Sequence, residues 1–144
     1  MIQRVSSSSL YIEGSLISQI KKGLLVLIGI SKSDNMNMID KLIEKLLKLR
    51  IFEDENSKMN HSILDINGEI LLVSQFTLYA DTKKGNRPSF FQAAHPKNAE
   101  PIYNKFLEKL NVALGDKIKT GKFGANMQVR LVNDGPVTII IENS

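Results

Sequence analysis

The sequence predicts an α/β fold, in which mixed or antiparallel β-sheets form layers and two main helices lie on one side. Short apolar runs rich in branched residues, each with the length of a buried strand, occur at 24–30, 70–73 and 137–141. Two longer segments, 34–50 and about 99–114, repeat apolar residues at helical spacing. The chain of 144 residues contains no linker or internal repeat, so we expect residues 1–144 to form a single domain.

The first 30 residues predict strands. Residues 2–5 are short and mixed in polarity, and Glu13-Gly14 marks a turn between apolar residues on either side. The four serines at 6–9 are compatible with a polar strand face or with a loose turn. The run at 24–30 is interrupted only by Gly29, which predicts a central strand of the sheet.

The segment 34–50 predicts the first helix, which Ser33, Asp34 or Asn35 can cap. Its apolar residues share one face, and we expect this face to pack on the protein's own sheet. These residues are Met38, Ile39, Leu42, Ile43, Leu46, Leu47 and Leu49. The acidic loop at 53–58 lacks the spacing and the glycine of an EF-hand, so it predicts a solvated turn and not a metal site.

A β-hairpin is predicted at Asn67-Gly68, because both residues of such a turn need positive φ angles. This hairpin would make 62–66 and 69–73 antiparallel neighbours. The loop at 81–91 follows, with three cations and then Phe90 and Phe91. It is compatible with binding phosphates and stacking on a base, and equally with a flexible basic loop anchored by its aromatic residues.

The second helix is expected to begin after a cap at Asn98, to carry Pro101 in its first turn and to stop at Gly115. A proline in the first turn costs little, because the N–H groups there have no partner within the helix. A basic connector is expected at 117–122.

The last part of the chain predicts two strands and a turn. Apolar and polar residues alternate at 127–131, which is typical of a half-buried strand. Asp134-Gly135-Pro136 then predicts a hairpin turn, with Pro136 starting the final strand at 137–141.

Composition is that of a soluble globular protein, with 42% hydrophobic and 24% charged residues. Because no run of 18 apolar residues and no signal-peptide pattern occurs, we expect a cytoplasmic protein away from membranes. The lack of cysteine excludes disulfides and cysteine nucleophiles. The net charge of +4 fits a polyanionic partner such as RNA, and it fits a lysine-rich solvated surface as well.

Side-chain catalysis has few candidates in this sequence. His61 and His95 are the only histidines, neither has a second ligand at zinc spacing, and no nucleophile elbow or phosphate-binding loop occurs. We therefore expect no metal and no cofactor. The main candidate site is the polar stretch Ser74-Gln75-Phe76-Thr77-Leu78, which follows a buried strand. Ligands commonly bind at such strand ends, although polar residues there also commonly complete a turn.

Two stretches together make the sequence recognisable. Ser74-Gln75-Phe76-Thr77-Leu78 and Asn133-Asp134-Gly135-Pro136-Val137-Thr138 resemble the two signature motifs of the D-aminoacyl-tRNA deacylase family in residue type, order and spacing. No signature position departs from the family pattern. The resemblance extends over nearly the whole chain and includes the segments 2–5, 22–26, 49–52, 84–90 and 120–125.

The resemblance implies a homodimeric hydrolase that cleaves the ester between tRNA and a D-amino acid, or a glycine mischarged on tRNA(Ala). Gly135 and Pro136 of one subunit, joined by a cis bond, would enter the other subunit's pocket and reject L-aminoacyl groups. Ser74, Gln75, Phe76 and Thr77 would line this pocket around the ester and the terminal adenosine. The implied partners are aminoacyl-tRNA and a second copy of the chain, with no DNA and no membrane.

In the implied mechanism, Gln75, Phe76 and Thr77 form the catalytic stretch. Backbone N–H groups near Phe76 and Thr77 would hold the developing oxyanion. The 2′-OH of the terminal ribose would help to activate water, which also explains a preference for RNA over DNA. Thr77 as a covalent nucleophile is a competing mechanism, although the sequence shows no base beside it.

Two other functions remain open from the residues. A non-catalytic tRNA-binding dimer, using the basic segments 83–87 and 117–122, would bind tRNA in a salt-dependent way without cleaving an ester. A small dimeric scaffold, in which the Gly-Pro turn only joins two subunits, would not bind tRNA.

Overall fold

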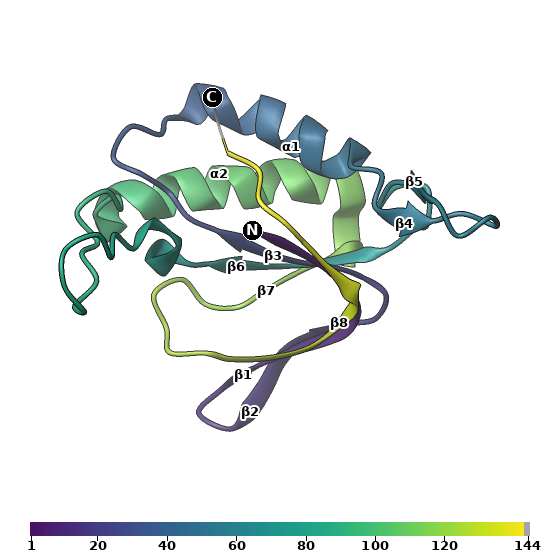
Figure 1. Ribbon diagram of the computed structural model, residues 1–144, viewed down its shortest axis with the longest axis horizontal. Coiled ribbons are helices and arrows are strands. Elements are labelled where there is room, and N and C mark those ends of the chain that lie inside the picture. Colours follow the sequence, from purple (N-terminus) through teal and green to yellow (C-terminus); the bar gives the residue numbers. More distant parts are fainter. Residues whose placement is uncertain (143–144) are drawn as a thin grey trace.

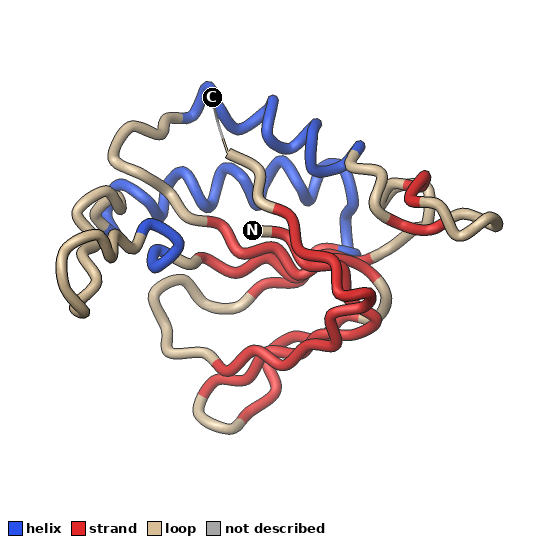
Figure 2. The backbone as a smooth tube through the Cα atoms, viewed as in Figure 1, coloured by secondary structure: helices blue, strands red, loops and turns tan. Residues whose placement is uncertain are grey.

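The computed structural model describes residues 1–142, in which two helices cover one face of a curved six-stranded sheet (Figures 1 and 2). The predicted class of α/β fold, with mixed sheet pairing and the main helices on one side, is confirmed. In chain order the elements are β1 (Ile2–Ile12), β2 (Ser15–Ile20), β3 (Gly23–Ile28), η1 (Met36–Met38), α1 (Ile39–Lys48), β4 (Phe52–Glu53), β5 (Met59–His61), β6 (Glu69–Ser74), η2 (Phe76–Tyr79), α2 (Pro96–Leu114), η3 (Gly115–Lys117), β7 (Ile118–Thr120) and β8 (Gln128–Ile139). None of the helices described is both long enough and apolar enough to cross a membrane.

The long strand β1 organises the N-terminal half of the sheet. It pairs antiparallel with β2 through Ser8–Ile12 and with β3 through Ile2–Val5. The predicted turn at Glu13-Gly14 is present, with φ angles of 48° and 80°. The serines lie within β1, and the hydroxyl of the buried Ser8 donates to the carbonyl of Arg130 at 2.9 Å.

The centre of the sheet is parallel. β6 lies between β3 and β7 and runs parallel to both, with Ile28 opposite Ser74 and Leu72 opposite Thr120. The predicted hairpin at Asn67-Gly68 is therefore wrong. Only Asn67 has a positive φ angle, 50°, whereas this hairpin turn needs one at both positions.

The segment before β6 forms a turn and not a strand. Asp65 accepts the N–H of Ser62 at 2.8 Å, and the N–H of Gly68 donates to the carbonyl of Ile63 at 3.1 Å. Ile63 is fully buried, so its side chain anchors this turn in the core.

The two faces of the central strands bury separate sets of side chains, because successive residues of a strand point to opposite faces. Leu24, Val26, Ile70 and Leu72 belong to the large core beneath α1 and α2. The alternate residues contribute to a second core, enclosed where β1, β2 and β8 curl away from the helices (Figure 1). This second core contains Val5, Leu10, Ile20, Leu25, Leu71 and Val73.

Both predicted helices are present, with different starts. The first is preceded by the short η1, which Asn35 caps by accepting the N–H of Asn37 at 2.9 Å. The second begins at Pro96, after a cap by His95, and not at Asn98. Pro101 consequently lies inside α2 and not in its first turn, so that part of the prediction is wrong.

The predicted hairpin at Asp134-Gly135-Pro136 is also wrong, because both flanking segments belong to one strand, β8, and pair with β1. Asn133 lies opposite Val5 and Thr138 opposite Gln3, so β8 advances five residues while β1 advances two. The additional residues form a bulge at 134–137, hereafter the β8 bulge. The expected basic connector at 117–122 contains a further strand, β7.

Candidate functional site

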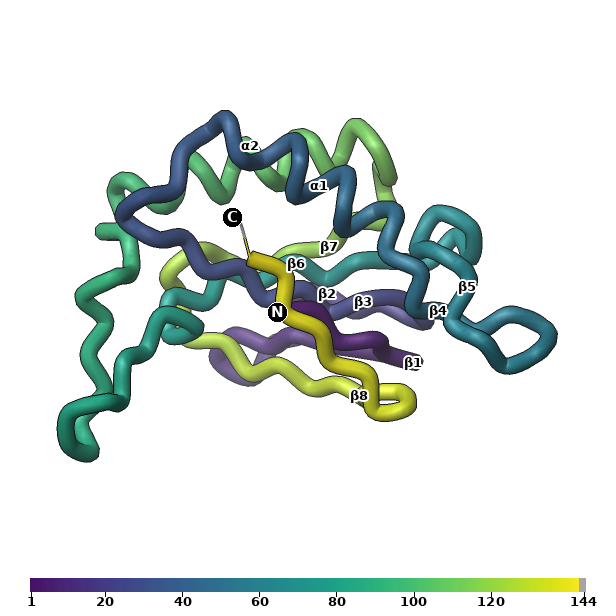
Figure 3. Tube along the Cα trace, turned by 45° about the horizontal axis from the view of Figure 1, so that its top comes forward, coloured from purple at the N-terminus to yellow at the C-terminus, as the bar shows by residue number. Residues whose placement is uncertain are grey.

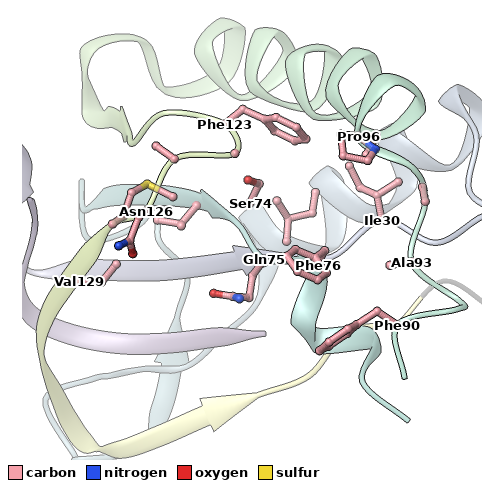
Figure 4. Close-up of a pocket in the computed structure, with 17 residues that line it drawn as sticks. Ile30, Ser74, Gln75, Phe76, Phe90, Ala93, Pro96, Phe123, Asn126 and Val129 are labelled. Carbon is pink, nitrogen blue, oxygen red and sulfur yellow. The ribbon is translucent and has the colours of Figure 1, made fainter. Parts of the chain in front are cut away.

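The carboxyl ends of the parallel strands β3, β6 and β7 meet at one edge of the sheet, and a pocket of about 550 Å³ opens there (Figure 4). In α/β sheets this edge is the usual place for a ligand, because the loops that leave neighbouring strands diverge around it. The lining comes from the ends of the strands, from the start of α2 and from the segment after β7. It consists of Ile28, Ile30, Val73, Ser74, Gln75, Phe76, Phe90, Ala93, Ala94, Pro96, Ala99, Phe123, Gly124, Ala125, Asn126, Met127 and Val129.

The short helix η2 begins at this pocket, where Phe76 belongs to the lining. The N–H of Gln75 donates to the carbonyl of Ile28 at 2.8 Å, which fixes the exit from β6. The first hydrogen bond of η2 runs from the N–H of Leu78 to the carbonyl of Gln75 at 3.3 Å. The N–H groups of Phe76 and Thr77 precede this bond, so the helix itself offers them no acceptor. An N–H group without an acceptor can bind an oxygen that carries negative charge.

Gly29 allows η2 to lie close against the end of β3. A Cβ atom on Gly29 would lie 3.0 Å from the ring of Tyr79 and 3.2 Å from the carbonyl oxygen of Gln75. These contacts are tighter than ordinary packing allows, so a side chain here would displace η2. Gly29 therefore helps to set the position of the two free N–H groups.

Ser74, Gln75 and Phe76, three of the residues predicted for the site, line the pocket. Among the described residues the lining does not include Thr77, whose exposed hydroxyl accepts a hydrogen bond from the side-chain amide of Gln75. An amide nitrogen does not take up a proton at neutral pH, so this contact does not activate Thr77 as a nucleophile.

The β8 bulge lies at the opposite end of the sheet from the carboxyl ends of β3 and β6, where the pocket opens; Figure 3 shows the path of β8 beside these strands. Asn133 pairs with Val5 of β1, Val5 pairs with Gly23 of β3, and Gly23 pairs with Glu69, the first residue of β6. Ser74 is the last residue of β6. Strand and residue spacings place the bulge and Ser74 about 20 Å apart. Gly135 and Pro136 therefore do not reach the pocket of their own chain.

The β8 bulge is exposed at its tip and held firmly at its base. Gly135 and Pro136 are exposed and joined by a cis peptide bond. The side chain of Asn133 accepts the N–H of Val137 at 2.9 Å. On its inner side, the buried guanidinium of Arg4 donates to the carbonyl of Asp134 at 2.9 Å.

Arg4 also ties the β8 bulge to a second segment. Its Nη1 donates to the carbonyl of Ile51 at 2.8 Å, and its Nη2 lies 3.9 Å from a carboxylate oxygen of Glu53. Only 6% of Arg4 is exposed, so these contacts replace the water that a buried charge would lose. The sequence alone assigns Arg4 no role, because an arginine beside Gln3 in a short strand of mixed polarity does not indicate burial.

Titratable side chains contribute little to the pocket. Burial raises the pKa of the Tyr79 phenol, and the nearby carboxylate of Asp34 raises it further, so this hydroxyl stays protonated at neutral pH. His95 is exposed and caps α2, with Nδ1 accepting the N–H of Lys97 at 3.4 Å. Within residues 1–142, no three carboxylates or imidazoles gather in a way that could hold a metal ion.

The sequence did not predict most of the lining. Phe123 and the residues that follow it extend from β7 across the mouth of the pocket, where Figure 4 shows the Phe123 ring above Ser74. Ala93, Ala94 and Pro96 come from the entry into α2. Most of these residues are small or apolar, so no motif of reactive groups could have indicated them.

Comparison with known proteins gives consistent matches. Residues 1–142 match the family described as D-Tyr-tRNA(Tyr) deacylase. A protein of Flavobacterium psychrophilum named D-aminoacyl-tRNA deacylase is 55% identical over 143 residues, which cover 99% of this chain and 95% of the relative. A protein of Thermosipho africanus with the same name is 52% identical over 144 residues, with the same coverage.

Solved structures agree in fold. A structure titled c-Myc DNA Unwinding Element Binding Protein superposes with a TM-score of 0.94 at 46% identity, covering 99% of this chain and 97% of the other. A second, titled as a structural analysis of a probable eukaryotic D-amino acid tRNA deacylase, has a TM-score of 0.78 at 18% identity and covers 92% of each chain. At that identity the second match shows the shared fold alone.

Proposed function

This chain belongs to the D-Tyr-tRNA(Tyr) deacylase family, and we propose that it hydrolyses the ester bond of D-aminoacyl-tRNA. The observation that carries the proposal is the pocket at the strand ends. Phe76, whose backbone N–H has no acceptor within η2, lines this pocket, and no Asp, Glu, His, Lys, Arg or Tyr of the described residues does. An aminoacyl ester is already reactive, so stabilisation of its oxyanion by backbone N–H groups is an effective route to hydrolysis.

In the proposed reaction, water adds to the ester carbonyl carbon, and the N–H groups of Phe76 and Thr77 hold the resulting oxyanion. The bond between this carbon and the ribose oxygen then breaks, and the ribose oxygen receives the proton that the water has lost. The 2′-OH of the terminal ribose assists the removal of this proton, a role for which the described pocket offers no obvious side chain. The products are a free amino acid and tRNA.

Selection of the D-amino acid is proposed to require a second copy of the chain. The tip of the β8 bulge is exposed and about 20 Å from the pocket of its own chain, a separation that suits insertion into a neighbour's pocket. There the partner subunit's Gly135 and the partner subunit's Pro136 would occupy the space that an L side chain needs. Rejection by a clash with rigid groups is an effective way to exclude one enantiomer. Glycine has no side chain to reject, so glycyl-tRNA(Ala) is a proposed substrate as well.

The test is to measure release of tyrosine from D-Tyr-tRNA and from L-Tyr-tRNA by the purified protein. We expect hydrolysis of the D-ester alone. Equal rates on both esters would contradict the chiral filter, and lack of cleavage with salt-dependent binding of tRNA would indicate a non-catalytic binding protein. A substrate ending in 2′-deoxyadenosine should react more slowly by at least tenfold if the 2′-OH assists.

Thr77 is tested separately. A Thr77→Ala variant should keep most of its activity, because the hydroxyl accepts from Gln75 and has no neighbouring base in the described structure. Loss of activity by a factor of a thousand or more, together with an acyl-enzyme trapped by rapid quenching, would establish the nucleophilic mechanism instead.

A further inference from the structure

A segment with an excess of positive charge lies beside the pocket. Residues 82–99 contain four cations, Lys83, Lys84, Arg87 and Lys97, and no carboxylate. This segment therefore has a local net charge of +4, and it also supplies Phe90, Ala93, Ala94, Pro96 and Ala99 to the lining.

Three of these cations lie on a defined loop. The N–H and carbonyl groups of Asp81 and Ser89 bond to each other, at 2.8 and 2.9 Å, and close the loop at 82–88. Lys83, Lys84 and Arg87 are exposed on it. Among the ion pairs of the described residues none involves these side chains, and the Asp81 carboxylate accepts the backbone N–H of Lys83. Their charge is thus available to a ligand.

Lys32, from another part of the chain, lies beside the same segment. Lys32 is held beside this segment by a hydrogen bond from its N–H to the carbonyl of Gln92 at 3.0 Å. Its ammonium lies 3.4 Å from the centre of the Phe91 ring, and Phe91 is 72% exposed. An exposed aromatic ring beside cations is the combination that single-stranded nucleic acids bind, through base stacking and phosphate contacts.

We propose that Lys32, Lys83, Lys84 and Arg87, together the cationic rim, bind phosphates of the RNA strand that leads to the esterified terminal nucleotide. The inference rests on the proposed function, because it places that ester in the adjoining pocket. A pocket of about 550 Å³ holds the end of such a substrate, and the rest of the strand has to leave past its mouth. Phosphate contacts of this kind position a substrate without reading its sequence. The rim therefore suits an enzyme that acts on many tRNAs.

The test compares two triple variants on two substrates. The rim variant carries Lys83→Ala, Lys84→Ala and Arg87→Ala. The control variant carries Lys41→Ala, Lys45→Ala and Lys58→Ala, which remove the same charge from exposed positions outside the rim. The substrates are D-Tyr-tRNA and the 3′-D-tyrosyl ester of adenosine, which has the scissile bond but no RNA chain. Light scattering gives the mass of each variant.

For the rim variant we expect kcat/KM on D-Tyr-tRNA to fall at least tenfold at about 0.1 M salt, while kcat/KM on the adenosine ester stays within about twofold. The slope of log(kcat/KM) against log[salt] should become shallower by about 2, since each single-strand phosphate contact contributes about 0.7. The control variant should match the wild type on both substrates.

Three results would overturn the proposal: equal losses on both substrates, equal losses in the two variants, or a change of mass in the rim variant. If the wild-type protein cleaves neither ester, the proposed function fails and the rim is tested by itself. Fluorescence anisotropy with uncharged tRNA then decides, because the rim predicts salt-dependent binding that the rim variant loses and the control variant keeps. Equal affinity of the two variants would refute the rim as well.

Discussion

Replacement of Arg4 by methionine tests whether one buried side chain holds the β8 bulge in place. Methionine has a similar length and an apolar character but no donor, so the carbonyls of Asp134 and Ile51 both lose a charged partner. An unsatisfied buried acceptor costs about 1–3 kcal/mol. The Ile51 contact is buried and the Asp134 contact only partly so, and we therefore expect a total loss of about 2–4 kcal/mol in the free energy of unfolding.

The functional effect of Arg4→Met should appear in selectivity. Without the hydrogen bond from Arg4, the segment 134–137 can move. A mobile segment would exclude an L side chain less well in its proposed role as a filter. We expect the ratio of kcat/KM for D-Tyr-tRNA to that for L-Tyr-tRNA to fall by at least tenfold, with a smaller change in the rate on the D-ester.

The measurements for Arg4 are urea unfolding at one fixed protein concentration, which removes the effect of assembly on apparent stability, and the two hydrolysis rates. Arg4→Lys is the matched control, because it keeps the charge but cannot direct two donors at diverging carbonyls. It should give an intermediate loss of stability. A methionine variant within about 0.5 kcal/mol of the wild type, with an unchanged D/L ratio, would refute the reasoning.

Three further predictions follow from backbone contacts and from one carboxylate. Gly29→Ala should lower kcat for D-Tyr-tRNA at least tenfold and change the free energy of unfolding by less than about 1 kcal/mol, because the added Cβ contacts η2 at the surface. Unchanged kinetics would contradict the role of Gly29 in positioning η2. Gly23→Ala should cost at least about 3 kcal/mol, measured by urea unfolding, because its Cβ would lie 1.8 Å from the carbonyl oxygen of Glu69 and force β3 and β6 apart; a mild effect would argue against their close pairing. The N–H and hydroxyl of Ser62 lower the pKa of Asp65, so its contribution to stability is present above its unfolded pKa of about 3.9 and is lost as the pH falls through the lower folded value. In Asp65→Asn the drop in Tm between pH 7 and pH 2.5 should be smaller than in the wild type, and an equal drop would exclude this contribution.

The sequence predicts the layers of this fold better than its connections. Apolar periodicity identifies both helices and the central strands, because burial of one face requires it. The pairing of β6 was predicted wrongly because Asn67-Gly68 matches the local sequence of a hairpin turn. The capped turn at Ser62 and the burial of Ile63 instead determine the path of the chain before β6. Such a choice depends on residues distant in sequence, which local turn rules do not include.

The start of α2 shows a different limit. Asn98 is a good capping residue, and His95 is seldom chosen as one, yet Pro96 fixes the backbone at the first helical position. A proline at that position favours the earlier start, whereas capping preference alone favours the later one. The resulting helix brings Pro96 and Ala99 to the pocket.

At the site, the sequence indicates the residues whose chemistry is visible in their side chains or motifs. Ser74, Gln75 and Phe76 lie at the pocket, and their roles in binding and catalysis stay predictions. The lining from Phe123 to Val129 was not predicted, because small and apolar residues become a binding surface only through the path of the chain after β7. The predicted roles of Gly135 and Pro136 stay a proposal, since they concern a second copy of the chain.

The positions of the pocket and of the β8 bulge have a consequence for assembly. Two exposed features at opposite ends of one sheet can each complete the other in a two-fold dimer, because an isologous interface makes every contact twice. Such a dimer would have two equivalent sites, each with the pocket of one chain and the proposed filter of its partner. Hydrolysis would then depend on groups within one chain and rejection of the L-ester on the pair. Dimer formation would therefore be a requirement for chiral selection itself and not only for stability.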